Sequence, residues 1–131
     1  MEGTSRFAKR NFKVSPYNFN RTYGQNLFVS NIGIGTYLGN LDAETDLAVE
    51  KAVVEVVSSG CINVIDTALN YRHMKAERSV GKAIKSIITN EGIAREEFVL
   101  SSKVGLVTDD LDNKVSGGYQ TNELIKSGAI S

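Results

Sequence analysis

Three residues of types used in acid–base chemistry follow two apolar stretches of the chain. The run CINVIDTA over 61–68 is nearly continuously apolar up to Asp66, Tyr71 follows five residues later, and Lys103 lies near the end of EFVLSSKVG over 97–105. A carboxylate at the end of a buried strand requires a cation or hydrogen-bond donors, and Lys103 can form an ion pair with it. A phenol beside that ammonium has its pKa lowered from about 10 toward neutrality. The trio therefore predicts Tyr71 as a proton donor.

The same residues are also consistent with a role confined to the fold. An Asp and a Lys at strand ends often form only a structural ion pair, and a Tyr above them is often simply packed, so spacing alone leaves both interpretations open. His73, the only histidine, lies two residues after Tyr71 and is interpreted as a solvated loop residue. The lone Cys61 and the lack of any zinc-type Cys/His spacing predict no metal site.

Alternating β-prone and amphipathic stretches are expected to position these residues. Residues 21–30 hold two short β-prone runs on either side of Gly24-Gln25-Asn26, which predicts a hairpin with a three-residue loop. Downstream, apolar runs predict strands, and apolar residues at steps of three and four predict helices. In chain order these are a strand over 31–37, a helix over 45–59, a strand over 61–68, a helix over 75–89 and a strand over 97–105.

The order strand, helix, strand, helix, strand predicts an α/β fold with parallel strands joined by right-handed crossovers. Chemistry in such folds lies beyond the carboxyl ends of the strands, where Asp66, Tyr71 and Lys103 all fall. A small doubly wound domain is the alternative fold. GIGTYLG at 33–39 is one residue longer than the dinucleotide fingerprint, however, so it is weak support for that alternative.

Several stretches together resemble the signature of the aldo-keto reductase family. GCINVIDTALNYRHMKAERSVGKAI at 60–84 is similar to its Gly-x-Asn-x-x-Asp-Thr-Ala-x-x-Tyr strand and loop, followed by a helix with Glu and Gly-Lys-Ala. REEFVLSSKVG at 95–105 is similar to its strand ending in Lys-Val-Gly. The likeness runs from about residue 21 to 105 and includes the hairpin and GIGTY, so it is more specific than any single motif.

The resemblance implies a fold, a reaction and a set of site residues. The fold is the N-terminal part of a (β/α)8 TIM barrel with a leading β-hairpin, truncated before closure, since such a barrel needs about 250 residues. The reaction is the reduction of an aldehyde or ketone to an alcohol by NADPH. Three members of the family's catalytic tetrad map onto Asp66, Tyr71 and Lys103. The nicotinamide-binding positions map onto Gly35, Thr36, Tyr37 and Asp66.

The fourth catalytic residue of the family is a His at the end of the fourth barrel strand, and the chain ends at Ser131, before that strand is expected. The segments that hold the phosphates and adenine of NADPH also belong to the later half. We therefore expect residues 21–131 to be a partial reductase domain that is inactive alone and self-associates through its open strand edge. The alternative is a non-catalytic truncated isoform or an interaction module.

Charge and hydropathy limit the partners and the compartment. Fifteen basic and fifteen acidic residues in 131 argue against nucleic acid or a membrane surface, and favour a small carbonyl substrate. No apolar run approaches the roughly 18 residues of a membrane span, and one cysteine fits the reducing cytoplasm. Residues 1–20 are basic and are expected to form a flexible arm. The remnant of a plastid or mitochondrial transit peptide is the alternative.

Overall fold

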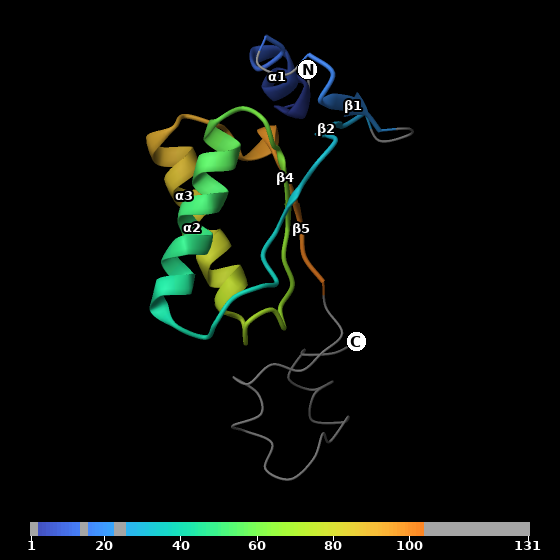
Figure 1. Cartoon of the computed structure of the whole chain (residues 1–131). Coiled ribbons are helices and arrows are strands. Elements are labelled where there is room, and N and C mark those ends of the chain that lie inside the picture. Colours follow the sequence, from blue (N-terminus) through green and yellow to red (C-terminus); the bar gives the residue numbers. More distant parts are fainter. Residues whose placement is uncertain (1–2, 14–15, 23–25, 104–131) are drawn as a thin grey trace, which may run out of the picture.

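A computed structural model describes residues 3–13, 16–22 and 26–103 of the chain. These residues form a mixed α/β arrangement, which confirms the α/β part of the predicted fold class (Figure 1). The elements in chain order are α1 (Gly3–Arg10), β1 (Phe19–Arg21), β2 (Phe28–Ser30), β3 (Ile34–Gly35), α2 (Ala43–Ser58), β4 (Val64–Asp66), α3 (Lys75–Asn90), the short 3₁₀ helix η1 (Arg95–Glu97) and β5 (Val99–Ser101).

Strands β3, β4 and β5 form a parallel sheet in chain order. The register sets Gly35 beside Asp66, and Asp66 beside Ser101. Helices α2 and α3 lie side by side on one face of this sheet (Figure 1). Each helix follows its strand as the alternating pattern predicts, and the three strands end at a common edge. Continuation of this sheet into a closed (β/α)8 barrel stays a prediction.

Helix α2 begins and ends at residues with clear local reasons. The Asp42 carboxylate accepts a hydrogen bond from the Thr45 backbone N–H at 2.7 Å, which caps the first turn. Val53 and Val57 on its apolar face are fully buried. Gly60 then takes a φ of +80° and donates its N–H to the Val57 carbonyl, a left-handed helix end that suits glycine. Both boundaries lie close to those expected from the sequence.

The predicted hairpin is present, but its loop is longer than expected. Strands β1 and β2 pair antiparallel with Phe19 opposite Ser30 and Arg21 opposite Phe28. The Thr22 N–H donates to the Leu27 carbonyl at 2.8 Å, and Gly24 and Gln25 of the predicted three-residue loop lie outside the described residues. The first strand begins earlier because Phe19 packs edge-on against Phe7, with ring centres 5.8 Å apart.

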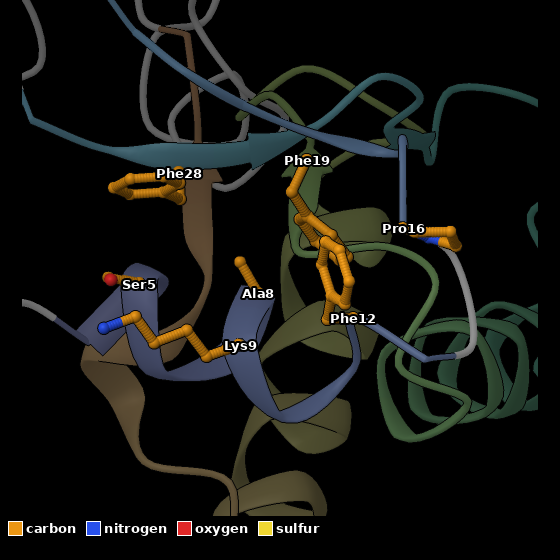
Figure 2. A pocket seen from close by; sticks show the side chains of 7 residues that line it. All are labelled: Ser5, Ala8, Lys9, Phe12, Pro16, Phe19 and Phe28. Carbon is orange, nitrogen blue, oxygen red and sulfur yellow. The ribbon is translucent and has the colours of Figure 1, made fainter.

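The flexible arm expected over residues 1–20 is not what the structure contains, because residues 3–10 form helix α1. Phe7 is fully buried, and the guanidinium groups of Arg6 and Arg10 bond Glu96 and Glu97 at 2.6 and 2.5 Å. The basic residues therefore have acidic partners in η1, about 90 positions away. An apolar pocket of about 170 Å³ lies between α1, Pro16 and the hairpin. Figure 2 shows the side chains that line it.

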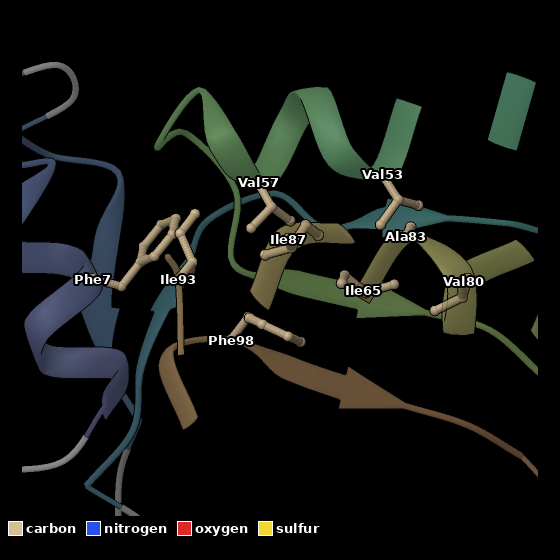
Figure 3. Packing of buried hydrophobic residues seen from close by; sticks show 9 residues of the cluster. All are labelled: Phe7, Val53, Val57, Ile65, Val80, Ala83, Ile87, Ile93 and Phe98. Atoms are coloured by element: carbon tan, nitrogen blue, oxygen red, sulfur yellow. The ribbon is translucent and has the colours of Figure 1, made fainter. Parts of the chain in front are cut away.

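The core lies between the parallel sheet and its helices, and α1 closes one end (Figure 3). Asn63, also fully buried, joins the hairpin to the sheet: its Oδ1 accepts from the Ser30 N–H at 2.8 Å, and its Nδ2 donates to the Phe28 carbonyl at 2.8 Å. The buried apolar side chains are Phe7, Val53, Val57, Ile65, Val80, Ala83, Ile87, Ile93 and Phe98.

The hairpin and α1 cover the amino ends of the parallel strands, and the carboxyl ends lie at the opposite end of the molecule (Figure 1). The residues after Lys103, including the segment 106–131 that the sequence predicts to be a loop, lie outside the described residues. Within the part of the chain that the structure describes, no helix is long and apolar enough to cross a membrane.

Candidate active site

Asp66 and Lys103 meet at the carboxyl edge of the sheet. The Lys103 ammonium donates to both carboxylate oxygens of Asp66, at 2.7 and 2.6 Å, and to the Thr67 carbonyl at 3.1 Å. Parallel pairing continues into the loops, where the Leu69 N–H donates to the Lys103 carbonyl at 3.3 Å. The pair is half-exposed, with 39% of the Asp66 and 50% of the Lys103 side chain accessible, so it lies at a surface that a small molecule can reach.

Tyr71 completes the predicted group. Its ring centre lies 4.9 Å from the Lys103 ammonium, and its ring packs edge-on against Tyr37 with the centres 5.0 Å apart. A cation at this distance from an aromatic ring is attracted to it. The structure therefore brings Asp66, Tyr71 and Lys103 together, as the topology of a parallel sheet predicts.

The charge of Lys103 is maintained by its neighbours. Hydrogen bonds to Asp66 raise the pKa of Lys103 above its ordinary value, partial burial opposes this, and the nearby Tyr71 phenol adds to the rise. Lys103 therefore remains an ammonium throughout the physiological range. The site has a permanent positive charge close to a phenol.

The loop that carries Tyr71 has an uncommon backbone. Arg72, His73 and Met74 have φ values of 51°, 53° and 67°, a left-handed run of three residues without a glycine. Each such residue costs of the order of 1 kcal/mol unless its surroundings hold it. Tyr71 bonds the loop at both ends: its N–H donates to the Ala68 carbonyl at 3.1 Å, and its carbonyl accepts from the Ala76 N–H at 3.3 Å. The turn thereby fixes the backbone of Tyr71 above the end of β4.

The predicted cofactor-binding residues Gly35, Thr36 and Tyr37 differ from one another in exposure and in contacts. At Gly35 an added Cβ would meet nothing within 4 Å, so open space adjoins the strand edge beside Asp66. Tyr37 is 63% exposed. Thr36 is buried, and its hydroxyl donates to the Asp66 carbonyl at 3.1 Å, so it helps to hold the strand edge rather than face a ligand.

A cavity of about 380 Å³ lies beside Tyr37, at the same end of the molecule. Tyr37, Gly39, Asn70, Arg72 and His73 are among its lining residues. His73 is exposed there, in line with the interpretation of this residue as a loop residue. Among the described residues, no three His, Cys, Asp or Glu side chains are grouped to hold a metal ion. The apolar pocket beside α1 in Figure 2 lies at the other end of the strands, away from the acid–base group.

Sequence reasoning did not single out Arg72 and Asp46. The side chain of Arg72 is only 2% exposed and pairs with Asp46 of α2. Its Nε also donates to the Asn40 carbonyl at 2.9 Å. One signal was present in the sequence: a cation directly follows the candidate proton donor.

Comparison with known families agrees with this geometry. A sequence model described as the aldo/keto reductase family matches residues 31–131, which is most of the chain. The chain belongs to this family. An aldo/keto reductase domain indicates an oxidoreductase, and members of the family generally use NAD(P)H. Searches among curated proteins and among solved structures return no match to this aldo/keto reductase chain.

Proposed function

We propose that this chain supplies the proton-donating part of an active site that reduces an aldehyde or ketone to an alcohol with NADPH. The observation that carries the proposal is the Tyr71 ring next to an ammonium that two carboxylate oxygens hold in place. The small carbonyl substrate is expected at the strand edge beside Tyr71, whose ring packs against Tyr37 in the wall of the neighbouring cavity.

The proposal gives each side chain one task. Tyr71 donates its phenolic proton to the carbonyl oxygen, which gains negative charge as the carbonyl carbon is reduced. The Lys103 ammonium stabilises the negative charge left on the phenol oxygen. Asp66 keeps Lys103 charged and directs it, because the ammonium donates to both of its oxygens. Together the three groups provide a proton at a defined place.

The residues present are compatible with a nicotinamide at the strand edge. A flat ring can approach Gly35, since no atom occupies the place of a side chain there. NADPH, when bound, supplies the hydride for the carbonyl carbon. Thr36 is not proposed as a direct contact, because its buried hydroxyl is already bonded to the Asp66 carbonyl.

We assign turnover to a protein in which these strands are continued to a complete barrel, and expect none from the 131-residue chain alone. The proposal takes the catalytic His and the phosphate-binding segments to lie after the third parallel strand, as expected from the resemblance. Strand β5 pairs on one side with β4, and no other described strand pairs with it. We propose that the chain alone self-associates through this edge, which sedimentation over a range of concentrations tests.

Tyr71→Phe tests the proposed function. In the complete barrel, kcat for a panel of aldehydes and ketones is expected to fall about 10²- to 10⁴-fold, the usual contribution of a general acid. The dissociation constant for NADPH is expected to stay the same, because the hydroxyl acts on the substrate. Tyr17→Phe is the matched control, since Tyr17 is 90% exposed. Full turnover by the Tyr71→Phe protein would refute the assignment.

A further inference from the structure

Arg72 connects the two loops that carry the tyrosines of the site. Tyr37 lies in the β3–α2 loop (residues 36–42), and Tyr71 in the β4–α3 loop (residues 67–74). The Arg72 side chain crosses between the loops: its Nε donates to the Asn40 carbonyl at 2.9 Å, and its Nη2 donates to the Asp46 carboxylate. One guanidinium group thus bonds the first loop and the first turn of α2 at the same time.

Asp46 links the Arg72 side chain to the first turns of both helices. It lies in the first turn of α2, and its second carboxylate oxygen accepts from Lys75, the first residue of α3, at 3.2 Å. Burial opposes its negative charge, but the hydrogen bonds from Arg72 and Lys75 outweigh burial and hold the pKa of Asp46 below its usual range. The carboxylate therefore ties the start of both helices to the Tyr71 loop.

The backbone of that loop requires such a constraint. Three successive left-handed residues without a glycine persist only where the surroundings over-determine them. Arg72 is the first of the three, and its side chain is almost fully enclosed. If the side chain is released, the turn is free to relax toward ordinary dihedral angles, and Tyr71, its direct neighbour, moves with it.

We propose that Arg72 is a positioning residue: by bonding Asn40 and Asp46 together, it holds the Tyr71 ring against Tyr37 and over the Lys103 ammonium. This inference rests on the proposed function, because position matters only if Tyr71 acts on a substrate. It assigns to Arg72 no contact with the reacting atoms.

A role limited to stability does not account for the arrangement. Within the described part of the chain, the Arg72 Nη1 atom is buried and has no hydrogen-bond partner. Arg72→Met removes this unpaired donor, which is unfavourable for folding, and Asp46 is left 24% exposed and still bonded to Lys75. Arg72→Met should therefore fold while losing both contacts, which makes the proposal testable.

The test is an NMR comparison of the full chain with its Arg72→Met and Arg72→Lys variants. In the unsubstituted chain, nuclear Overhauser contacts should join the Tyr37 and Tyr71 rings, and the ε-methylene protons of Lys103 should be shifted upfield by the Tyr71 ring. Both signatures should be lost in the two variants, with the core methyl shifts of Ile65 and Ile87 unchanged. Lysine should not rescue, because a single ammonium lacks the planar fork that reaches two acceptors.

Arg95→Met is the matched control, since Arg95 lies in η1 and donates to the Phe98 carbonyl. It should keep both ring signatures. Asp46→Asn provides a second variant in case Arg72→Met does not fold, and it should weaken the same signatures. Intact ring signatures in folded Arg72→Met, or full rescue by Arg72→Lys, would overturn the proposal.

A kinetic arm separates this inference from the proposed function. In the complete barrel, Arg72→Met should lower kcat about 10²-fold, as expected for a misplacement of the order of 1 Å, and leave KM for the carbonyl nearly unchanged. The NMR arm needs no turnover. If Tyr71→Phe keeps its activity while the ring signatures respond to Arg72, the proposed function fails and the geometric role of Arg72 stands.

Discussion

The Lys103 ammonium lies 2.7 and 2.6 Å from the two carboxylate oxygens of Asp66, across the neighbouring strand ends of a parallel sheet. The third hydrogen bond of this ammonium goes to the Thr67 carbonyl at 3.1 Å. The Lys103 ammonium is thereby held by the last residue of β4 and the first residue of the loop after it, while the Lys103 backbone follows the end of β5. Because the ion pair joins β4 to the end of β5, the protonation state of Lys103 contributes to the stability of this sheet edge.

Alkaline pH should weaken that contribution. The pKa of Lys103 is higher in the folded chain than in the unfolded one, mainly because of Asp66. Its contribution to stability is therefore complete below the unfolded value of about 10.4 and is lost as the pH rises through the folded value. We expect the free energy of unfolding to fall above about pH 10 by more in the native sequence than in Lys103→Met.

Urea denaturation between neutral pH and pH 11 measures this difference. Lys82→Met, on an exposed position of α3, is the control and should retain the alkaline loss of the native chain. Parallel stability curves for the native chain and Lys103→Met would contradict the linkage.

Lowering the pH should reduce the contribution of Asp46 to stability, whereas raising the pH reduces that of Lys103. Although burial opposes it, hydrogen bonds from Arg72 and Lys75 hold the pKa of Asp46 below its unfolded value. Its contribution is thus present above about pH 3.9 and lost as the pH falls through the lowered folded value. The stability advantage of the native chain over Asp46→Asn should shrink as the pH falls below about 4.

Thermal unfolding from pH 6 to pH 2 checks this expectation. Glu44→Gln, exposed in the same first turn of α2, removes a carboxylate without removing the contact to Arg72. A difference between Asp46→Asn and the native chain that is constant with pH would rule out the effect.

The grouping of Asp66, Tyr71 and Lys103 was predictable from the sequence for a physical reason. Successive parallel strands end at one edge, so polar residues that close two apolar runs must come together there. The position of helix α2 was equally predictable, because Asp42 and Gly60 mark the limits of an amphipathic stretch.

Other features depend on contacts that no local pattern contains. The basic composition of residues 1–20 suggested a flexible arm, because Glu96 and Glu97, the partners of Arg6 and Arg10, lie about 90 positions later. The left-handed turn at Arg72 was not predictable either, since Arg-His-Met lacks the glycine or asparagine that signals such a backbone. The Arg72 side chain in this turn contacts Asp46, which lies 26 positions away, so no local pattern could have indicated the contact.

The anchor between the hairpin and the sheet provides a further prediction. Asn63→Ala removes the partners of the Ser30 N–H and the Phe28 carbonyl. Because each buried group left unpaired costs about 1–3 kcal/mol, we expect a loss of roughly 3 kcal/mol in the free energy of unfolding. Urea denaturation measures it, with Asn90→Ala at an exposed position of α3 as the control. Equal stability of the two variants would contradict the anchor.

The last prediction concerns α1 and distinguishes a helix packed into the core from a flexible arm. Phe7 is fully buried in the core and contacts Phe19, whereas Phe12, just after the helix, is 60% exposed. Phe7→Ala should cost about 3–5 kcal/mol, the range for a buried phenylalanine, and Phe12→Ala within about 0.5 kcal/mol. Thermal unfolding of both variants measures the contrast. If Phe7→Ala is as stable as Phe12→Ala, the helix is not part of the core, and residues 1–20 are the arm that their basic composition suggests.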